Sequence, residues 1–234
     1  MSEVPEEKAK IRPIVGLLPE RNGVPSAAIF FDMIAIAQRG WPFIRTDYGD
    51  TIVQRNKFAD HLLASDFTHL LMLDADHRHP PDIVERLTRW VKKDPTRLVV
   101  AGLCFRRGVP FDPNVFIVNE AENAIYQPAE WGRGLMQVDI AGTAEMLIAR
   151  EVFERLPKPW FARDYSGAAE GKWPGEDVWF SQRCGELGVD IWVDTTTTGP
   201  HLMESWVDAQ TYRTYAAMTA PPASGMTEAD LTGA

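Results

Sequence analysis

Two carboxylates, Asp74 and Asp76, end a run of apolar residues in the segment "THLLMLDADHRHPPD", Thr68 to Asp82. In an extended chain residues i and i+2 project to the same side, so both carboxylates can face one point. Neighbouring anions repel, and Mg²⁺ or Mn²⁺ relieves that repulsion because these ions prefer oxygen ligands and commonly bridge carboxylates to substrate phosphates. The spacing therefore indicates a cation site. A solvated, aspartate-rich turn is the alternative, and a lone D-x-D pattern does not decide between the two.

Three histidines lie near the ends of predicted strands. His77 and His79 stand in the turn directly after the two carboxylates, where histidines are usually exposed, and the sequence assigns a role to neither. His201 follows the apolar segment "VDIWVDTTTTGP", so after a Gly-Pro turn its imidazole can return to the edge where the carboxylates lie. An ordinary loop histidine is the alternative for His201.

A second acidic pair, Glu176 and Asp177, stands in the segment "WPGEDVWFSQRCGELG" at the start of a predicted amphipathic helix over residues 177–187. The helix dipole alone favours acidic residues at this position, which is a purely structural explanation. The pair also follows an aromatic, glycine-rich loop over residues 157–175 that could fold over a substrate. A carboxylate at the mouth of such a loop can act as a general base.

Two groups of polar and basic residues could hold phosphate. Arg55 and Asn56 lie near the start of a predicted helix over residues 51–65, where backbone N–H groups and a cation can bind a phosphate or a base. Arg106 and Arg107 follow the apolar segment "VVAGLCF" and would point to the ligand edge of a sheet. For the first group, solvation of the helix surface is the alternative.

Strand-like and helix-like segments alternate along the chain. Apolar runs predict strands near residues 14–18, 69–76, 97–105, 114–119, 135–142 and 189–196. Helical spacing of apolar residues predicts helices over residues 25–40, 51–65, 82–93, 149–156 and 177–187. This alternation predicts an α/β fold with a mostly parallel central sheet flanked by helices. Ligands of such sheets bind beyond the carboxyl ends of the strands.

The composition limits the class of protein. The chain has 234 residues, 45% of them hydrophobic, so it can bury the core of one domain. A formal charge of −9 argues against long nucleic acid as a partner, because such binding requires clustered Lys and Arg. Two isolated cysteines, an acidic N-terminus and the lack of a long apolar run predict a cytoplasmic protein with no disulfide framework and no transmembrane segment. We expect residues 11–218 to form the domain, between flexible residues 1–10 and 219–234.

These elements in this order resemble a GT-A glycosyltransferase, in particular the short family 2-like enzymes of bacteria and their phages. Four segments, which together cover most of Ile14 to His201, carry the resemblance: "VQRNKFADHLLASDFTHLLMLDAD", "VVAGLCFRRGVPF", "VDIAGTAEMLIAREVFERL" and "GEDVWFSQRCGELGVDIWVDTTTTGPH". The resemblance implies a single GT-A, Rossmann-like domain. It also implies metal-dependent transfer of a sugar from a nucleotide-diphosphate sugar, a UDP- or GDP-sugar, to an acceptor that the sequence does not identify.

The resemblance implies roles for individual residues on the donor side. The D-x-D motif of the family falls on Asp74 and Asp76, with Asp76 holding Mn²⁺ or Mg²⁺ against the diphosphate and Asp74 touching the ribose or a metal-bound water. His201 corresponds to the histidine that often completes the metal site. The implied donor-binding residues are Pro19, Glu20, Arg21, Arg55, Asn56, Asp74, Ala75, Asp76 and Arg106.

The resemblance also assigns the catalytic and acceptor sides. The acidic pair of the family falls on Glu176 and Asp177, and we favour Asp177 as the base of an inverting reaction, with Glu176 as the alternative. Trp173 and Glu145 are the acceptor-side candidates. Glu145 is a departure, because relatives tend to have Gly-Thr-Gly followed by small or apolar residues where this chain has "AGTAEML". Its carboxylate either contacts a hydroxyl or cation of the acceptor or is solvated.

Two other functions are compatible with the sequence. A sugar-phosphate nucleotidyltransferase would share the α/β layout and the paired carboxylates. Such an enzyme normally has a glycine-rich, basic loop after its first strand, where "LLPERNGVPS" supplies one Gly and one Arg. A non-catalytic module of the same fold that binds a sugar or a partner is the second alternative.

Overall fold

The computed structural model describes residues 10–18, 27–46, 49–108, 110–119, 124–128, 130–166, 174–203, 208–211 and 213–214. Contacts between residues divide the chain into two compact units, Met1–Leu202 and Met203–Ala234. In the second unit, residues 209–211 and 213–214 are helical, and the backbone N–H of Thr211 donates to the Asp208 carboxylate at 2.8 Å. The domain boundaries at residues 11–218 stay a prediction, because the two predicted tails lie almost wholly outside the described residues.

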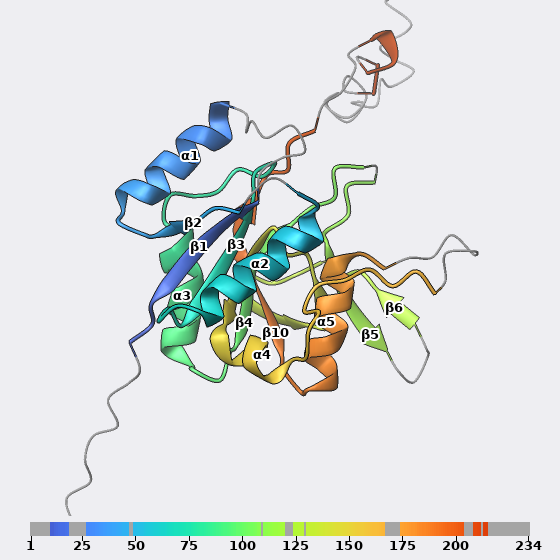
Figure 1. Cartoon of the computed structure of the whole chain (residues 1–234). Helices are drawn as coiled ribbons and strands as arrows, with labels where there is room; N and C mark the ends of the chain where they lie inside the picture. The colour runs from blue at the N-terminus through green and yellow to red at the C-terminus, as the bar shows by residue number, and fades with distance from the viewer. Residues whose placement is uncertain are drawn as a thin grey trace, which may run out of the picture. The chain divides into compact units, whose positions relative to one another are not determined.

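A seven-stranded sheet forms the centre of the first unit (Figure 1), with the strand order β2-β1-β3-β9-β4-β10-β7. Five strands, β1, β2, β3, β4 and β10, run in one direction, whereas β9 and β7 run antiparallel to their neighbours. The bounds are β1 Pro13–Leu18, β2 Phe43–Ile44, β3 His69–Asp74, β4 Val99–Cys104, β7 Leu135–Val138, β9 Glu145–Ala149 and β10 Ile191–Gly199. The predicted α/β fold with a mostly parallel central sheet is confirmed.

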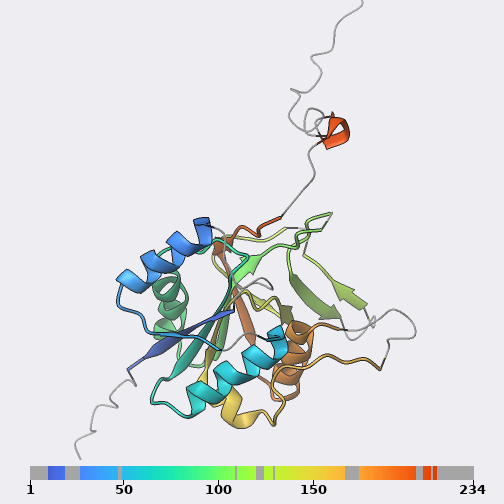
Figure 2. The ribbon, with the colours of Figure 1, turned by 45° about the horizontal axis from the view of Figure 1, so that its top comes forward.

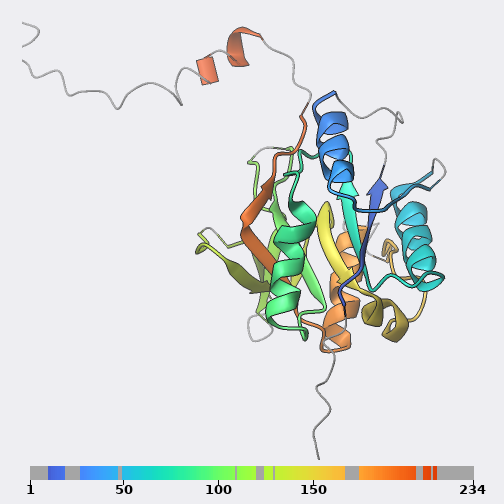
Figure 3. The same cartoon turned by 90° about the vertical axis from the view of Figure 1, so that its left-hand side faces the viewer.

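Helices cover both faces of this sheet (Figure 3). α1 (Ala27–Gln38) and α3 (Ile83–Lys93) pack on one face, in a core shared with Leu71 of β3 and Leu147 of β9. α2 (Thr51–Leu63), α4 (Arg150–Arg155) and α5 (Glu176–Glu186) pack on the other face. Successive residues of β9 thus enter opposite cores, as the alternation of side chains along a strand requires.

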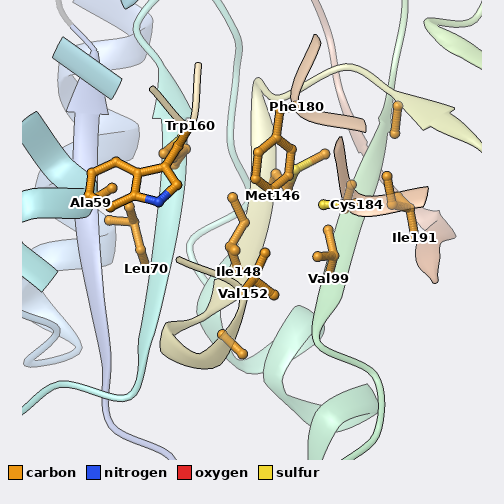
Figure 4. Packing of buried hydrophobic residues seen from close by; sticks show 14 of the residues in the cluster. Ala59, Leu70, Val99, Met146, Ile148, Val152, Trp160, Phe180, Cys184 and Ile191 are labelled. Carbon is orange, nitrogen blue, oxygen red and sulfur yellow. The ribbon is translucent and has the colours of Figure 1, made fainter. Parts of the chain in front are cut away.

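The core beneath α2, α4 and α5 is the one that fixes α5 in place (Figure 4). Phe180 of α5 is fully buried and stacks on Phe161, with ring centroids 4.8 Å apart. Phe153 of α4 lies against both rings. A fully buried side chain of this size stabilises a fold by about 1.5–3 kcal/mol. This packing holds the N-terminus of α5 at a fixed place beside the sheet.

A smaller sheet has the order β6-β5-β8, with β5 at Val115–Asn119, β6 at Ala124–Tyr126 and β8 at Ile140–Ala141. Figures 1 and 2 show β5 and β6 beside α5, away from α1. Asn114 precedes β5, and its backbone N–H donates to Cys104 while its carbonyl accepts from Gly142, each at 2.8 Å. The small sheet therefore fixes Asn114 between the ends of β4 and β8.

The strand β9 differs from the sequence-based expectation. The predicted elements leave residues 143–148 unassigned, but Glu145–Ala149 form a strand in the middle of the sheet, between β3 and β4. All five residues of β9 are buried, so the segment lacks the alternation of a half-buried strand, and it passes directly into α4 without a break. In the part of the chain that the structure describes, no helix is both long and apolar enough to cross a membrane.

The carboxyl ends of the parallel strands meet at one edge of the sheet, the carboxyl edge. Register places Leu18 of β1 beside Asp74 of β3, and Gly199 of β10 beside Cys104 of β4. β9 is antiparallel, so it begins at this edge, with Glu145 paired to Leu73. The segments that follow β3, β4 and β10 carry the polar residues that the sequence singles out.

Candidate functional site

A pocket of about 550 Å³ opens at the carboxyl edge. Its walls come from the ends of β3, β4 and β10, the segment before β9, the start of α5 and the residue Arg55 of α2. The lining residues are Arg55, Asp74, His77, Cys104, Phe105, Arg106, Arg107, Gly108, Asn114, Phe116, Thr143, Ala144, Gly175, Glu176, Asp177, Val178 and His201. Its volume lies within the range of small-molecule sites.

At one wall of the pocket, Asp76, His77 and His201 form a compact group that we call the Asp76 cluster. His77 Nδ1 lies 2.9 Å from Oδ1 of Asp76, and His201 Nε2 lies 3.1 Å from Oδ2. One ligand atom from each of the three residues lies within 4.8 Å of the others. Among the described residues, this is the one group of such side chains with the spacing to hold a metal ion.

Backbone pairing brings the two histidines of the Asp76 cluster together. His77 and His201 face each other in an antiparallel bridge, flanked by hydrogen bonds from Arg78 N to Pro200 O at 2.9 Å and from Leu202 N to Asp76 O at 2.7 Å. Residues opposed in this way lie side by side, and the two imidazoles stack with centroids 3.9 Å apart. Backbone hydrogen bonds thus join the turn after β3 to the chain after β10.

The electrostatics of the Asp76 cluster favour an ionised Asp76 carboxylate beside a histidine with a raised pKa. Burial alone would raise the pKa of Asp76, but hydrogen bonds from His201 and His77 outweigh it and hold that pKa well below its usual value. Burial lowers the pKa of His201, and its bonds to Asp76 and to the Phe105 carbonyl outweigh this and raise it. His201 Nδ1 donates to that carbonyl at 2.9 Å, so Nε2 is the nitrogen that faces Asp76. A metal ligand histidine is typically oriented by such a bond.

Arg55, another lining residue of the pocket, joins Asp74 of the motif to Glu176 of α5. The side chain of Arg55 is 3% exposed, and its Nη2 donates to both oxygens of Asp74 at 3.0 and 3.1 Å. Its Nη1 lies 3.4 Å from Oε1 of Glu176. Burial lowers the pKa of Arg55, but the charges of Asp74, Glu176 and Asp177 outweigh it and raise that pKa. Asp50 caps α2 by accepting from Ile52 N at 2.9 Å, which fixes the turn that carries Arg55.

Asp177 occupies the first turn of α5 and faces the same pocket. Its Oδ1 accepts from the backbone N–H of Val178 at 2.8 Å, and its Oδ2 accepts from the amide of Asn114 at 3.3 Å. A Cβ on Gly175 would lie 2.7 Å from Oδ1 of Asp177, so a glycine is required for the carboxylate to take this position. Oδ2 keeps a lone pair for a further donor.

Behind the carboxyl edge, His79 and Glu145 form a pair without solvent exposure. His79 Nδ1 lies 2.7 Å from Oε1 of Glu145, and Nε2 lies 2.8 Å from the Asp74 carbonyl. Burial lowers the pKa of His79, but the hydrogen bond and charge of Glu145 outweigh it and raise that pKa. The carboxylate lies so close to Gly102 and Gly199 that a Cβ on either would collide with it. The pair ties the backbone of the Asp-Ala-Asp motif to β9.

The structure brings many of the predicted site residues together. Arg55, Asp74, Arg106, Glu176, Asp177 and His201 line the pocket, and Asp76 lies beside it in contact with His201. Ala75 is buried, and Asn56 lies outside the pocket, because its amide bonds the carbonyl of Phe161 and the backbone N–H of Trp160. Pro19, Glu20, Arg21 and Trp173 lie outside the described residues.

The predicted position of Glu145 needs correction. Glu145 neither lines the pocket nor is solvated, because its side chain is 0% exposed and pairs with His79. The expectation that His77 and His79 are exposed turn residues is also wrong, since they are 3% and 2% exposed. Sequence reasoning missed Asn114 and Thr143, two lining residues of which Thr143 has a buried hydroxyl without a hydrogen-bond partner in the described structure. No local pattern marks either residue.

Comparisons with known proteins bear on the fold. No family model and no curated protein matches the chain. Among solved structures, A197 from STIV shares 18% identity over 82% of this chain and 86% of its own, with a TM-score of 0.58. GalNAc-T7 with UDP, GalNAc and Mn²⁺ shares 12% identity over 94% of this chain and 53% of its own, with a TM-score of 0.49. CMP:2-keto-3-deoxy-manno-octonic acid synthetase complexed with CTP shares 14% identity over 88% of this chain and 98% of its own, with a TM-score of 0.43.

At these sequence identities the similarity concerns the fold alone. Only the TM-score of 0.58, for A197 from STIV, is high enough to show a shared fold. The chain therefore shares an α/β fold with A197 from STIV. The fold and the pocket together describe an α/β protein with a pocket at the carboxyl edge of its sheet, which is where ligands of this class of fold bind.

Proposed function

We propose that this protein is a metal-dependent glycosyltransferase of the GT-A type that moves a sugar from a UDP- or GDP-sugar to an acceptor hydroxyl. The observation that supports this most is that one pocket combines two kinds of group. One wall holds the Asp76 cluster, and the start of α5 holds the carboxylate of Asp177. Inverting, metal-dependent transfer from a nucleotide sugar uses both, namely a cationic centre for the leaving diphosphate and a base for the acceptor.

The donor set of the Asp76 cluster indicates which metal it would hold. Two imidazole nitrogens and one carboxylate suit Mn²⁺ better than Mg²⁺, which takes oxygen ligands almost exclusively. Asp76, His77 and His201 are the proposed ligands. A bound Mn²⁺ would neutralise the negative charge that develops on the leaving diphosphate. Arg106 and Arg107, both exposed at the pocket, would add hydrogen bonds to the phosphate oxygens.

Asp177 is the proposed base. Asn114 and the backbone N–H of Val178 donate hydrogen bonds to its carboxylate, and Asp177 lines the pocket that the acceptor would enter. In an inverting reaction the acceptor oxygen would bond to the anomeric carbon as the bond from that carbon to the diphosphate oxygen breaks. The hydroxyl proton would pass to Asp177. Glu176 is less suited to this role, because Arg55 lies 3.4 Å and Arg163 3.8 Å from its oxygens.

The test is a panel of UDP- and GDP-sugars with Mn²⁺, in which release of the nucleoside diphosphate and of the sugar is measured. We expect hydrolysis of at least one donor, and we expect Asp177→Asn to reduce turnover by about 10²-fold or more while the donor still binds. Asp190→Asn, an exposed carboxylate at the opposite end of β10, is the matched control. Unchanged turnover in Asp177→Asn would remove that residue as the base.

The same panel separates the alternatives. Pyrophosphate release from a nucleoside triphosphate and a sugar phosphate would identify a nucleotidyltransferase instead. Donor binding without turnover in the presence of candidate acceptors would favour the non-catalytic module. A failure of every donor to bind in the presence of Mn²⁺ would refute the proposed function.

A further inference from the structure

A second pocket, of about 760 Å³, lies between α3 and the bulged part of β10, and it shares no lining residue with the first. We call it the basic pocket. Its lining residues are Asp82, Arg86, Arg89, Trp90, Lys93, Arg133, Gly134 and Thr196. Four of these side chains are cationic and one is anionic. A local excess of positive charge in a chain whose formal charge is −9 is a feature of this place, not of the whole surface.

A bulge in β10 organises the basic pocket. The register between β10 and β4 shifts between Asp194 and Thr198, and within this bulge Thr196 contacts Arg86 and Arg89 of α3. The carboxylate of Asp194 is fully buried and accepts from Arg89 Nη2 at 2.7 Å. The hydroxyl of Thr196 accepts from the same Nη2 at 2.9 Å. Arg89 is therefore held by the strand and does not swing freely in solvent.

The bulge also binds the backbone that carries Arg133, the one cation of the basic pocket that lies outside α3. The hydroxyl of Thr195 donates to the carbonyl of Gly132 at 2.6 Å and accepts from the backbone N–H of Gly134 at 2.9 Å. The backbone N–H of Thr195 donates to the Gly134 carbonyl at 2.8 Å. These bonds hold the backbone on both sides of Arg133, which lines the basic pocket.

Trp90 orders the two cations beside it. Its ring lies 4.9 Å from the Arg89 guanidinium carbon and 5.3 Å from Nζ of Lys93. Such contacts hold cationic side chains against an aromatic face and reduce the entropy lost when they bind an anion. Local helix effects explain part of this charge, since Arg86 pairs with Asp82 at 2.7 Å and Lys93 stands in the last turn of α3. They do not explain why a separate loop adds Arg133.

We propose that the basic pocket binds the phosphate groups of a small phosphorylated ligand, separately from the pocket that contains Asp177. Guanidinium groups bind phosphate through paired hydrogen bonds, and lysine adds a compact charge. The pocket volume lies within the range of small-molecule sites. The basic pocket has four cationic side chains, and two of them already pair with an aspartate, Arg86 with Asp82 and Arg89 with Asp194. This charge suits one or two phosphates. It falls short of the continuous basic surface that a nucleic acid strand requires.

The test is a calorimetric titration of the full chain with inorganic pyrophosphate in the presence of EDTA, which removes metal-dependent binding at the Asp76 cluster. The full chain should bind pyrophosphate, and Arg133→Ala and Lys93→Ala should each weaken binding about tenfold or more, because a charge-assisted hydrogen bond contributes roughly 1.5–3 kcal/mol. Lys92→Ala is the matched control, since Lys92 is an exposed neighbour in the same turn but does not line the pocket. It should change affinity less than about twofold.

Several results would overturn the proposal. One is a lack of binding by the unmodified chain at millimolar pyrophosphate, and another is equal weakening by Lys92→Ala and Lys93→Ala. Loss of binding in Arg107→Ala but not in Arg133→Ala would locate the anion in the first pocket. Binding of a single-stranded oligonucleotide through Arg133 and Lys93, at least about a hundredfold tighter than pyrophosphate, would replace the small ligand by nucleic acid. Because no metal or sugar donor is used, none of these results depends on the proposed glycosyl transfer.

Discussion

Replacement of Arg55 tests whether its buried ion pairs with Asp74 and Glu176 stabilise the fold. Arg55 and Arg107 each pair with an aspartate of the Asp-Ala-Asp motif, Arg55 with Asp74 and Arg107 with Asp76 at 3.3 Å. The two arginines differ in burial, since their side chains are 3% and 61% exposed. Arg55→Gln and Arg107→Gln therefore remove the same kind of ion pair from two different environments.

The burial difference sets the expected magnitudes. Removing one partner of a buried ion pair leaves an uncompensated charge and costs about 3–5 kcal/mol. Arg55→Gln removes the cation that pairs with Asp74 and one of the two arginines beside Glu176, whose Oε1 lies 3.4 Å from the same guanidinium. An exposed pair contributes about 0–1 kcal/mol, so Arg107→Gln should change the free energy of unfolding by at most that amount.

Urea unfolding followed by circular dichroism measures both free energies, and the slope m shows whether the two-state comparison is valid. The double variant Arg55→Gln/Asp74→Asn should recover part of the loss, because it removes one of the unpaired charges. Equal costs for Arg55→Gln and Arg107→Gln, or a cost below about 1 kcal/mol for Arg55→Gln, would refute the conclusion that Arg55 is a buried structural cation.

Three further predictions concern other parts of the molecule. Burial lowers the pKa of His69 from 6.5 to about 4, so the neutral form is favoured in the folded state. The free energy of unfolding should fall by about 3 kcal/mol more between pH 6.5 and pH 4 in the unmodified chain than in His69→Gln, and equal pH profiles would contradict this. Glu145→Gln should cost about 3 kcal/mol in urea unfolding by breaking the pair with His79, and a cost no larger than that of an exposed control such as Glu186→Gln would contradict it. Gly175→Ala should lower turnover of a sugar donor about tenfold or more by displacing Asp177, with donor affinity kept; unchanged turnover would show that the carboxylate can move without loss.

The regular elements of the fold are predictable from the sequence, because periodicity is a local property. The apolar spacing of Ile83, Leu87 and Val91 predicts α3, and the apolar run before Asp74 predicts β3. β9 is not predictable in this way. Its residues are buried on both faces and continue into α4, so the segment shows neither alternation nor a turn signal.

The site is predictable only in part, because its geometry depends on residues far apart in the chain. The spacing of Asp74 and Asp76 indicates a cation site, and the resemblance adds His201, which lies 125 positions after Asp76 in the chain. The sequence assigns no role to His77, the third member of the Asp76 cluster. His79 looks like an exposed turn residue until Glu145, 66 positions later, pairs with it inside the sheet. Glu145 looks like a solvated or acceptor-facing carboxylate for the same reason. A sequence pattern specifies which groups are present, whereas their pairing is decided by the order of strands in the sheet.

Metal-dependent binding of a nucleotide at the Asp76 cluster tests the proposed function most directly. Calorimetric titrations with UDP and with GDP, each in Mn²⁺ and in EDTA, compare the unmodified chain with Asp76→Asn. We predict that Mn²⁺ strengthens binding of one nucleotide about tenfold or more, and that Asp76→Asn abolishes this gain. Equal affinities with Mn²⁺ and with EDTA, or a gain that persists in Asp76→Asn, would contradict the account.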